Sequence, residues 1–258
     1  MPRGAAALAG EGANPWIYGL HAVAAALDNK HRRIERFVAT TGGFERLKAL
    51  LPAAPQPELQ TREELEALVP PNAVHQGVGL LAAPLMPPSL TEILKSAPEA
   101  ALIVVLDQVT DPQNVGAVLR SAAAFGAYAL VMQDRHAPPI SGAMAKAASG
   151  AVESLPIVRA TNLSRALEEL RDGGFWCIGL DGGAAQPLSE ARLDGRIALV
   201  MGSEDTGLRR LTAEHCDLLA RLPTEAGFGV LNVSAAAAAA LYECARQRNN
   251  KSHLPPRP

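Results

Sequence analysis

Asp107-Gln-Val-Thr-Asp-Pro-Gln-Asn-Val-Gly-Ala-Val-Leu-Arg120 sets the architecture of this 258-residue chain. It follows a continuous apolar run, Ala101 to Leu106, and it opens into a helical pattern that reaches Phe125. The stretches Met201-Gly-Ser-Glu-Asp-Thr-Gly-Leu-Arg-Arg-Leu-Thr212 and Leu222-Pro-Thr-Glu-Ala-Gly-Phe-Gly-Val-Leu-Asn-Val-Ser234 are organised in the same way. Each places small or polar residues where a strand ends, and ligands of open α/β sheets bind at such strand ends. The three stretches together predict one shared site.

From residue 101 onward, apolar runs alternate with helical patterns. Runs that are apolar on both faces and separated by helices indicate a parallel sheet covered on both sides. An alanine run, Ala235 to Ala240, predicts a helix lying very close to the sheet or to another subunit, because alanine favours helix and allows close approach. Thr161 is the expected cap of one helix. We expect strands over 101–106, 128–132, 155–158, 175–180, 197–201 and 218–222, and helices over 114–125, 141–149, 163–170 and 232–246.

A smaller α/β unit precedes this region. Helices are expected over 18–27, 44–51 and 62–69, and strands over 34–40 and 76–82. Pro84-Leu-Met-Pro-Pro-Ser89 indicates a linker, because proline interrupts helices and sheet interiors alike. We therefore predict a disordered extension (1–14), a first domain (15–83), a linker (84–100), a second domain (101–248) and a disordered tail (249–258).

The charge of the chain gives no global sign of a nucleic-acid partner. The net charge is −2, from 24 basic and 26 acidic residues, whereas a basic stripe or high pI is the usual footprint of such binding. Contact with RNA therefore depends on local clusters. The candidates are Lys30-His31-Arg32-Arg33 with Arg36, and Arg209-Arg210. The alternative for both is ordinary solvated surface charge.

The cysteines, Cys177, Cys216 and Cys244, are widely spaced and odd in number. This usage fits reduced thiols of a cytoplasmic protein better than a disulfide framework. No Cys or His spacing is typical of a metal site, so no metal is expected. No run of 18 apolar residues occurs, so no membrane span is expected either.

The three stretches together resemble the SpoU/TrmH family of RNA ribose 2′-O-methyltransferases. Asn114 and Arg120 match the opening motif, Gly202-Ser-Glu204 matches the Gly-x-Glu motif, and Pro223 followed by Leu231-Asn-Val-Ser234 matches the closing motif. Tyr18-Gly-Leu-His-Ala-Val23 and His75-Gln-Gly-Val78 resemble recurring phrases of the small substrate-recognition domain of this family. The resemblance covers residues 16 to 247.

The resemblance implies an α/β fold with a C-terminal SPOUT methyltransferase domain, whose parallel sheet carries a deep trefoil knot. A small N-terminal L30e-like domain would recognise the substrate. The pattern of the sequence alone predicts a plain sheet, since knots are essentially absent from proteins. The resemblance also implies S-adenosylmethionine as cofactor, RNA as substrate, and a homodimer with the knot and last helix at its interface. It is closest to the type that methylates a guanosine of 23S ribosomal RNA.

The resemblance assigns the backbone around Gly202, Leu222 and Leu231 to the cofactor. Glycine and loop backbone suit this role, because their N–H and C=O groups can approach an adenine edge closely. The structural alternative is that Gly202 merely ends a strand. Arg32 and Arg33, with Arg120, are the expected RNA contacts.

The expected catalytic residues are Asn114, Arg120, Glu204 and Asn232. Arginine stays protonated, with a pKa above about 12, so we expect Arg120 to bind phosphate and stabilise the developing alkoxide rather than act as a base. It could otherwise be a surface arginine. Asn114 lies at a helix start, where asparagine also serves as an N-cap. Glu204 is expected to orient Arg120 or the substrate, or else to be a first-turn acid, and Asn232 to orient the closing loop or the ribose.

One position departs from the family pattern. Val230 stands two residues before Asn232, where the family usually has a serine. Either Ser234, Thr224 or backbone takes over, or activity or substrate choice has changed. The alternatives to an rRNA enzyme are a tRNA methyltransferase and an RNA-binding protein with weak catalysis. A nicotinamide or flavin enzyme would need a Gly-x-Gly-x-x-Gly turn, which does not follow Leu106.

Overall fold

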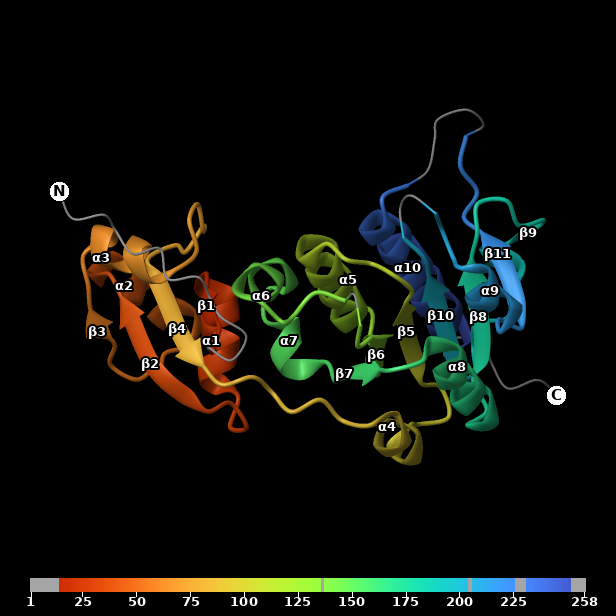
Figure 1. Ribbon diagram of the computed structural model, residues 1–258, viewed down its shortest axis with the longest axis horizontal. Coiled ribbons are helices and arrows are strands. Elements are labelled where there is room, and N and C mark those ends of the chain that lie inside the picture. Colours follow the sequence, from red (N-terminus) through yellow and green to blue (C-terminus); the bar gives the residue numbers. More distant parts are fainter. Residues whose placement is uncertain (1–13, 136, 204–205, 226–230, 252–258) are drawn as a thin grey trace. The chain divides into compact units, whose positions relative to one another are not determined.

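The computed structural model describes residues 14–135, 137–203, 206–225 and 231–251 (Figure 1). The chain divides into two compact units. The first unit holds the described residues up to Leu85 together with Ile140–Gly142, and the second unit holds the others. Most of the expected N-terminal extension, over 1–13, and most of the expected tail, over 252–258, lie outside the described residues.

The first unit is built on a four-stranded mixed sheet. In sheet order, its strands are β1 (Trp16–Tyr18), β4 (Val78–Ala82), β2 (Ile34–Ala39) and β3 (Glu58–Leu59). Its helices are α1 (Leu20–Asp28), α2 (Thr41–Leu50) and α3 (Arg62–Leu68). Tyr18, expected in a helix, instead ends a strand, because β1 pairs with β4 and Tyr18 faces Gly79. Val38, Leu47, Leu65 and Leu80 are completely buried and form the centre of the core.

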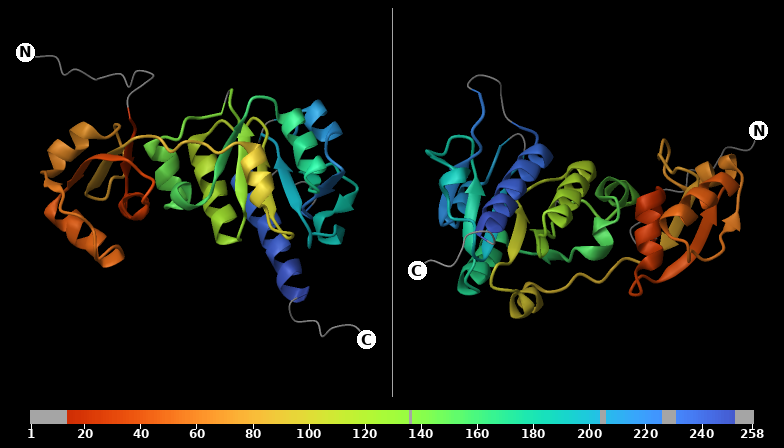
Figure 2. Two further views of the ribbon diagram at one scale, coloured as in Figure 1. Left: turned by 90° about the horizontal axis from the view of Figure 1, so that it is seen from below. Right: turned by 180° about the vertical axis from the view of Figure 1, so that it is seen from behind.

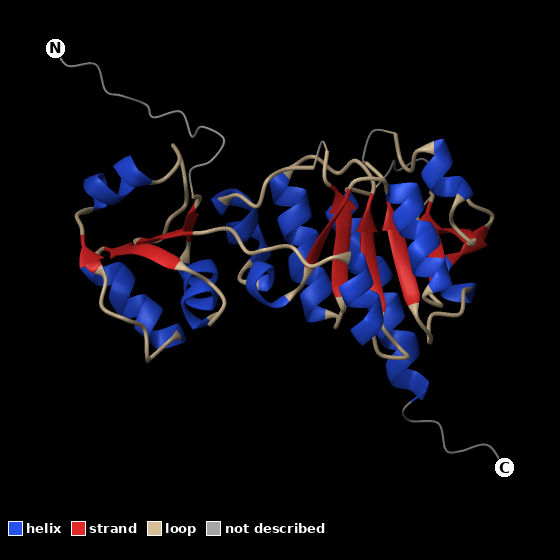
Figure 3. Cartoon of the chain, turned by 60° about the horizontal axis from the view of Figure 1, so that its bottom comes forward, coloured by secondary structure: helices blue, strands red, loops and turns tan. Residues whose placement is uncertain are grey.

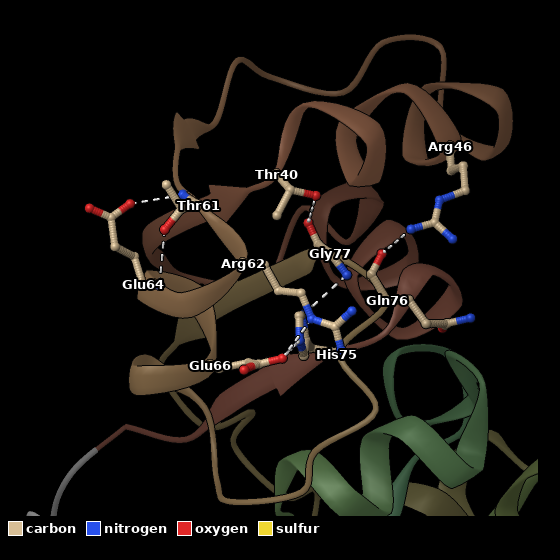
Figure 4. Close-up of polar contacts among 9 residues, drawn as sticks. All are labelled: Thr40, Arg46, Thr61, Arg62, Glu64, Glu66, His75, Gln76 and Gly77. Atoms are coloured by element: carbon tan, nitrogen blue, oxygen red, sulfur yellow. Dashed lines mark hydrogen bonds and ion pairs between the residues drawn. The ribbon is translucent and has the colours of Figure 1, made fainter.

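A tight turn before β4 is held from several sides (Figure 4). Gln76 and Gly77 have positive φ angles of 56° and 81°. The Gly77 carbonyl accepts a hydrogen bond from the main-chain N–H of Thr40 at 2.8 Å, and Arg46 donates to the Gln76 carbonyl at 2.9 Å. A Cβ at Gly43 would lie 2.1 Å from the Gly77 oxygen, so only glycine allows this approach. The strand expected from 76 therefore begins at Val78.

The second unit contains a seven-stranded sheet in which neighbouring strands pair in parallel. This confirms the parallel sheet predicted from the apolar runs. In sheet order, the strands are β7 (Ile157–Ala160), β6 (Ala129–Gln133), β5 (Leu102–Leu106), β10 (Ile197–Met201), β8 (Trp176–Leu180), β11 (Leu218–Arg221) and β9 (Gln186–Pro187).

Helices lie on both faces of this sheet (Figures 2 and 3). On one face, Ile103 and Val105 of β5 pack in a buried cluster with Ile93 and Leu167. Val104, between them, points to the opposite face of the sheet, because successive side chains of a strand alternate. It is also completely buried, so this face is covered as well. The remaining helical segments are α4 (Leu90–Ser96), α5 (Pro112–Ala124), α6 (Gly142–Ala148), α7 (Ala151–Ser154), α8 (Leu163–Asp172), the 3-10 turn η1 (Leu188–Glu190), α9 (Arg210–Glu214) and α10 (Val233–Lys251).

Three expectations about helix ends were wrong. Helix α8 is capped by Asn162, whose side chain accepts from the N–H of Arg165, and not by Thr161. Helix α5 is capped by Asp111 and begins at Pro112, so Asn114 lies inside its first turn. Helix α10 continues to Lys251, so residues 249–251 are helical rather than part of a disordered tail.

The order of the strands departs from their order along the chain. Strand β11 lies between β8 and β9, although the chain runs from β8 through β9 to β10 before it reaches β11. The connection over 181–196 therefore reaches past β11 and returns. Arg221 of β11 donates to the Ala184 carbonyl of this connection at 3.0 Å, and Gln247 of α10 donates to the Ser189 carbonyl at 3.3 Å. This order is compatible with the trefoil knot that the resemblance implies, and the knot stays a prediction.

Candidate functional site

The three stretches identified in the sequence begin at the same edge of the seven-stranded sheet. Leu106 and Met201 are register partners at the ends of β5 and β10. The main-chain N–H of Asp107 continues this pairing by donating to the Met201 carbonyl at 2.8 Å. Strand β11 runs parallel to these strands, and Leu222 follows its last residue. Because the strands are parallel, their carboxyl ends share one edge, as the sequence predicted.

Asn114 and Asn232 are joined directly. The Asp111 carboxylate accepts from the main-chain N–H groups of Gln113 and Asn114 at 3.1 and 3.2 Å, so the Asn114 side chain is not the cap. Nδ2 of Asn232 donates to Oδ1 of Asn114 at 3.2 Å. Two of the expected catalytic residues, from the opening and closing motifs, therefore meet.

Ser234 fixes the orientation of Asn232. Oδ1 of Asn232 accepts from the main-chain N–H of Ser234 at 2.9 Å and from its hydroxyl at 2.6 Å. With both donors on Oδ1, the Nδ2 group of Asn232 is the one that faces Asn114. The carbonyl of Asn232 also accepts from the N–H of Ala236 in the first turn of α10. The amide thus joins the start of α10 to α5.

After β10, the chain at Gly202–Ser203 lies close to the chain at Thr206–Gly207. Ser203 and Gly207 exchange two main-chain hydrogen bonds, of 3.2 and 3.0 Å. The hydroxyls of Ser203 and Thr206 lie 2.8 Å apart. A Cβ on Gly202 would lie 2.0 Å from the carbonyl carbon of Gly207, so the closeness of the two chains requires glycine there. This close packing explains by itself why position 202 is a glycine. It is compatible with the expected role of Gly202 at the cofactor. Glu204 lies outside the described residues.

Arg120 lies on the exposed side of α5, six residues after Asn114. Its side chain makes no hydrogen bond or ion pair within the part of the chain that the structure describes. Of the residues expected at the cofactor, Leu222 is half-buried and Leu231 is 42% exposed. Val230, the departure from the family pattern, is outside the described ranges.

The basic clusters of the sequence are largely paired within the protein. Arg32 is only 7% exposed, and its Nη1 donates to the Ala83 carbonyl at 2.8 Å. Its guanidinium therefore serves the interior of the first unit, which weighs against the expected RNA contact. Arg33 is exposed and lies 3.5 Å from Glu35. Arg36 is paired with Glu58 at 2.7 Å, and Arg210 with Glu214 at 2.7 Å.

The three cysteine thiols are not suited to act as nucleophiles or as metal ligands. Burial raises the pKa of Cys177, Cys216 and Cys244 to about 12, from 9.0. A thiol, unlike a thiolate, is a poor nucleophile and metal ligand. Among the described residues, no group of His, Cys, Asp and Glu could hold a metal ion. The described helices include none long and apolar enough to cross a membrane.

The roles of three residues around the site were not predicted from the sequence. Asp111 had a readable signal, since an Asp before a proline at the first helical position is a typical helix start. Ser234 was considered only as a replacement for the serine missing at Val230, and its contacts with Asn232, which depend on the local turn, were not predicted. Asp107 was quoted only as the start of a stretch. Its carboxylate accepts two hydrogen bonds from Arg209, which is 102 residues away and therefore beyond local pattern analysis.

The chain is similar to known RNA methyltransferases. The model of the SpoU rRNA methylase family matches residues 101–242, and the model for RNA 2′-O ribose methyltransferase substrate binding matches residues 16–88. The 23S rRNA (guanosine-2′-O-)-methyltransferase RlmB of Pseudomonas putida is 40% identical over 246 residues, covering 91% of this chain and 97% of that protein.

Two solved structures extend the comparison. The SpoU methyltransferase AviRb of Streptomyces viridochromogenes has a TM-score of 0.77 at 22% identity, covering 93% of this chain and 91% of that one, and so supports the fold. An AdoMet-bound rRNA methyltransferase of Sinorhizobium meliloti has a TM-score of 0.72 at 25% identity, covering 90% and 87% of the two chains.

Proposed function

The chain belongs to the SpoU rRNA methylase family, and from this membership we propose that it transfers a methyl group from S-adenosylmethionine to a ribose 2′-hydroxyl, that of a guanosine in 23S rRNA. The observation that carries the proposal is the 40% identity to a 23S rRNA (guanosine-2′-O-)-methyltransferase over 91% of this chain and 97% of the relative. The match to both family models means that the catalytic and the substrate-binding regions are present together.

The cofactor is assigned to the strand ends that meet at the carboxyl edge of the sheet. Main-chain groups just beyond β10 and β11, at Gly202 and Leu222, and the chain at Leu231 before α10 are the groups that would hold it. Main-chain N–H and C=O groups can hydrogen-bond to the edge of an adenine. The absence of a Cβ at Gly202 lets the main chain of Gly207 approach closely, which keeps this part of the site narrow. When bound, S-adenosylmethionine supplies a methyl carbon that its sulfonium already activates.

The protein must place the 2′-oxygen in line with that methyl carbon and support the loss of its proton. Positioning of two reactants supplies a large share of such an acceleration. Arg120 is exposed, and we assign it to the RNA side, where its guanidinium binds phosphate and stabilises the developing negative charge on the 2′-oxygen. Asn114 and Asn232, held together by their hydrogen bond, orient the ribose, and Glu204 orients Arg120 or the substrate.

The first unit is assigned to recognition of the RNA. We propose a recognition domain over 15–83, a linker over 84–100 and a methyltransferase domain over 101–248. Of the two arginines expected to contact RNA in this domain, Arg33 is the exposed one and pairs only at the surface, with Glu35, so among the described residues it suits a phosphate contact better than Arg32. Arg32 is assigned to the stability of this domain, because its guanidinium is buried against Ala83.

Three finer features complete the proposal. The SPOUT domain carries a trefoil knot, with β11 inside the excursion from β8 to β10. The protein acts as a homodimer, which the alanine-rich helix α10 and its exposed Tyr242 suit, since small side chains allow helices to approach closely. It works in the cytoplasm, where bacterial ribosomal RNA is made and modified.

A ribose-methylation map of total RNA tests the function. Cells that lack the gene are compared with wild-type cells and with cells complemented by the wild-type gene. Loss of one 2′-O-methylguanosine from 23S rRNA, restored by complementation, is the expected result. Loss of a tRNA methyl group with an unchanged rRNA map would move the activity to tRNA. An unchanged map of both RNAs would contradict an active methyltransferase and leave RNA binding as the function.

A further inference from the structure

Asp107 carries a buried charge at the edge of the candidate site. It is the first residue after β5, and its side chain is completely buried. Its Oδ2 accepts from the main-chain N–H of Arg209 at 3.1 Å, and its Oδ1 accepts from Nε of the same residue at 2.8 Å. A buried carboxylate is costly unless it is paired and hydrogen-bonded, and here Arg209 satisfies both oxygens.

Asp107 contacts the residues at both ends of one segment. The segment 202–209 begins after Met201, whose carbonyl accepts from the main-chain N–H of Asp107 at 2.8 Å. It ends at Arg209, the residue before α9, which is bound by the Asp107 carboxylate. A single residue of the opening stretch therefore fixes the entry and the exit of the segment that contains Gly202.

The described residues of this segment have other support as well. Ser203 and Gly207 pair through two main-chain hydrogen bonds, the hydroxyls of Ser203 and Thr206 lie 2.8 Å apart, and Leu208 packs against the buried core cluster. Asp107 adds to these contacts the ionic one, which holds Arg209 beside the end of β5. The carboxylate is buried, and both of its oxygens accept from Arg209, so these contacts support a role in positioning Arg209.

We propose that Asp107 is a positioning residue, which holds the chain at Met201–Gly202 and at Arg209 in the arrangement that binds S-adenosylmethionine. This inference rests on the proposed function, which places Gly202 at the cofactor. Loss of the Asp107 charge would weaken the hold on Arg209. The protein would then bind the cofactor more weakly, because binding must first restore this arrangement.

The experiment compares Asp107→Asn with Asp217→Asn in the full-length protein. Asp217 is a control with the same kinds of contact, because its Oδ2 also accepts a main-chain N–H, that of Cys177 at 2.8 Å, and its Oδ1 lies 3.7 Å from Nε of Arg171, although its side chain is 30% exposed. It precedes β11 and therefore lies at the opposite, amino-terminal end of the strands. Calorimetric titration with S-adenosylmethionine gives Kd, and thermal unfolding gives Tm, with all titrations performed well below the lowest Tm.

We expect Asp107→Asn to raise Kd, and KM for S-adenosylmethionine, by about tenfold, the effect of one lost hydrogen bond to a charged group, with a smaller change in kcat. Asp217→Asn should lower Tm and leave Kd unchanged. A lower Tm with an unchanged Kd in Asp107→Asn would overturn the proposal and reduce Asp107 to a stabilising residue.

Two further measurements keep the outcome decisive. If Asp107→Asn does not fold, Arg209→Met removes the Nε contact and the counter-charge of the buried Asp107 carboxylate and should raise Kd in the same direction, and an unchanged Kd there also overturns the proposal. If the wild-type protein does not bind S-adenosylmethionine at all, the proposed function itself fails. That result is distinct from a failure confined to the Asp107 variants.

Discussion

Nδ2 of Asn232 donates to Oδ1 of Asn114 at 3.2 Å, and this bond joins positions 118 residues apart in the chain. The direction of the bond is set by Ser234, whose N–H and hydroxyl both donate to Oδ1 of Asn232. Asn114 is in turn placed by Asp111, which caps α5. The opening and closing stretches are therefore one structural unit, in which each amide has a defined orientation.

Asn232→Asp tests this unit, because it changes one donor into an acceptor. The aspartate still accepts both bonds from Ser234, but it cannot donate to Asn114, and its oxygen would face Oδ1 of Asn114. We expect kcat for methylation of an RNA substrate to fall by at least about tenfold, the effect of replacing one hydrogen bond by a repulsion. The measurement is single-turnover methyl transfer at neutral pH, together with the Kd for S-adenosylmethionine.

Ser234→Ala is the graded control for that substitution. It removes only the hydroxyl bond and keeps the main-chain N–H on Oδ1 of Asn232. The rate should fall by only a few-fold, since Asn232 keeps its orientation. If both variants lost the same share of the rate, Ser234 would not act by orienting Asn232 toward Asn114. That result would indicate a general disturbance at the start of α10.

Arg120→Ala should abolish methyl transfer and leave the Kd for S-adenosylmethionine nearly unchanged. The physical reason is that the Arg120 side chain is exposed and is assigned to the RNA phosphate and the developing alkoxide, not to the cofactor. Filter-bound methyl transfer and calorimetry measure the two quantities. Arg165→Ala is a suitable control, because Arg165 is also an exposed helical arginine and pairs at the surface with Glu169. A large rise in Kd for Arg120→Ala would contradict the assignment.

The parallel sheet and the common edge were predictable because they depend on local pattern. Buried strands such as Leu102–Leu106 are apolar on both faces, and polar residues follow each strand end. The position of β10 between β5 and β8 was not predictable from the residues, because strand order depends on contacts between distant segments. Two-residue β9 and five-residue α9 are too short to show a period.

The site was predictable to a similar extent. Asn114 and Asn232 were identified from the family resemblance, and the structure brings them together. Arg32 and Arg33 were indistinguishable in the sequence, since both belong to one basic run, and only the fold separates the buried one from the exposed one. Asp107 escaped notice because its partner Arg209 lies in another stretch.

The stability of the protein should fall as the pH rises above 9. Burial raises the pKa of Cys177, Cys216 and Cys244 to about 12 in the folded state, from 9.0. A raised folded pKa means that the unfolded chain loses these protons first, so the contribution is complete below pH 9 and is lost between about 9 and 12. Urea unfolding at pH 8 and pH 10 measures the difference. Replacing the three thiols by alanine should reduce this pH dependence, and an unchanged dependence would assign it to other groups.

Arg33→Ala and Arg32→Ala should separate RNA binding from stability within one basic run. Arg33 is exposed, so its loss should weaken binding to a 23S rRNA fragment and reduce the slope of log K against log salt by about one unit. Arg32 is buried and donates to Ala83, so its loss should lower Tm and leave the slope unchanged. Fluorescence titration at several salt concentrations and thermal unfolding provide both readouts. If Arg32→Ala reduced the slope and Arg33→Ala did not, the assignment of the two arginines would be reversed.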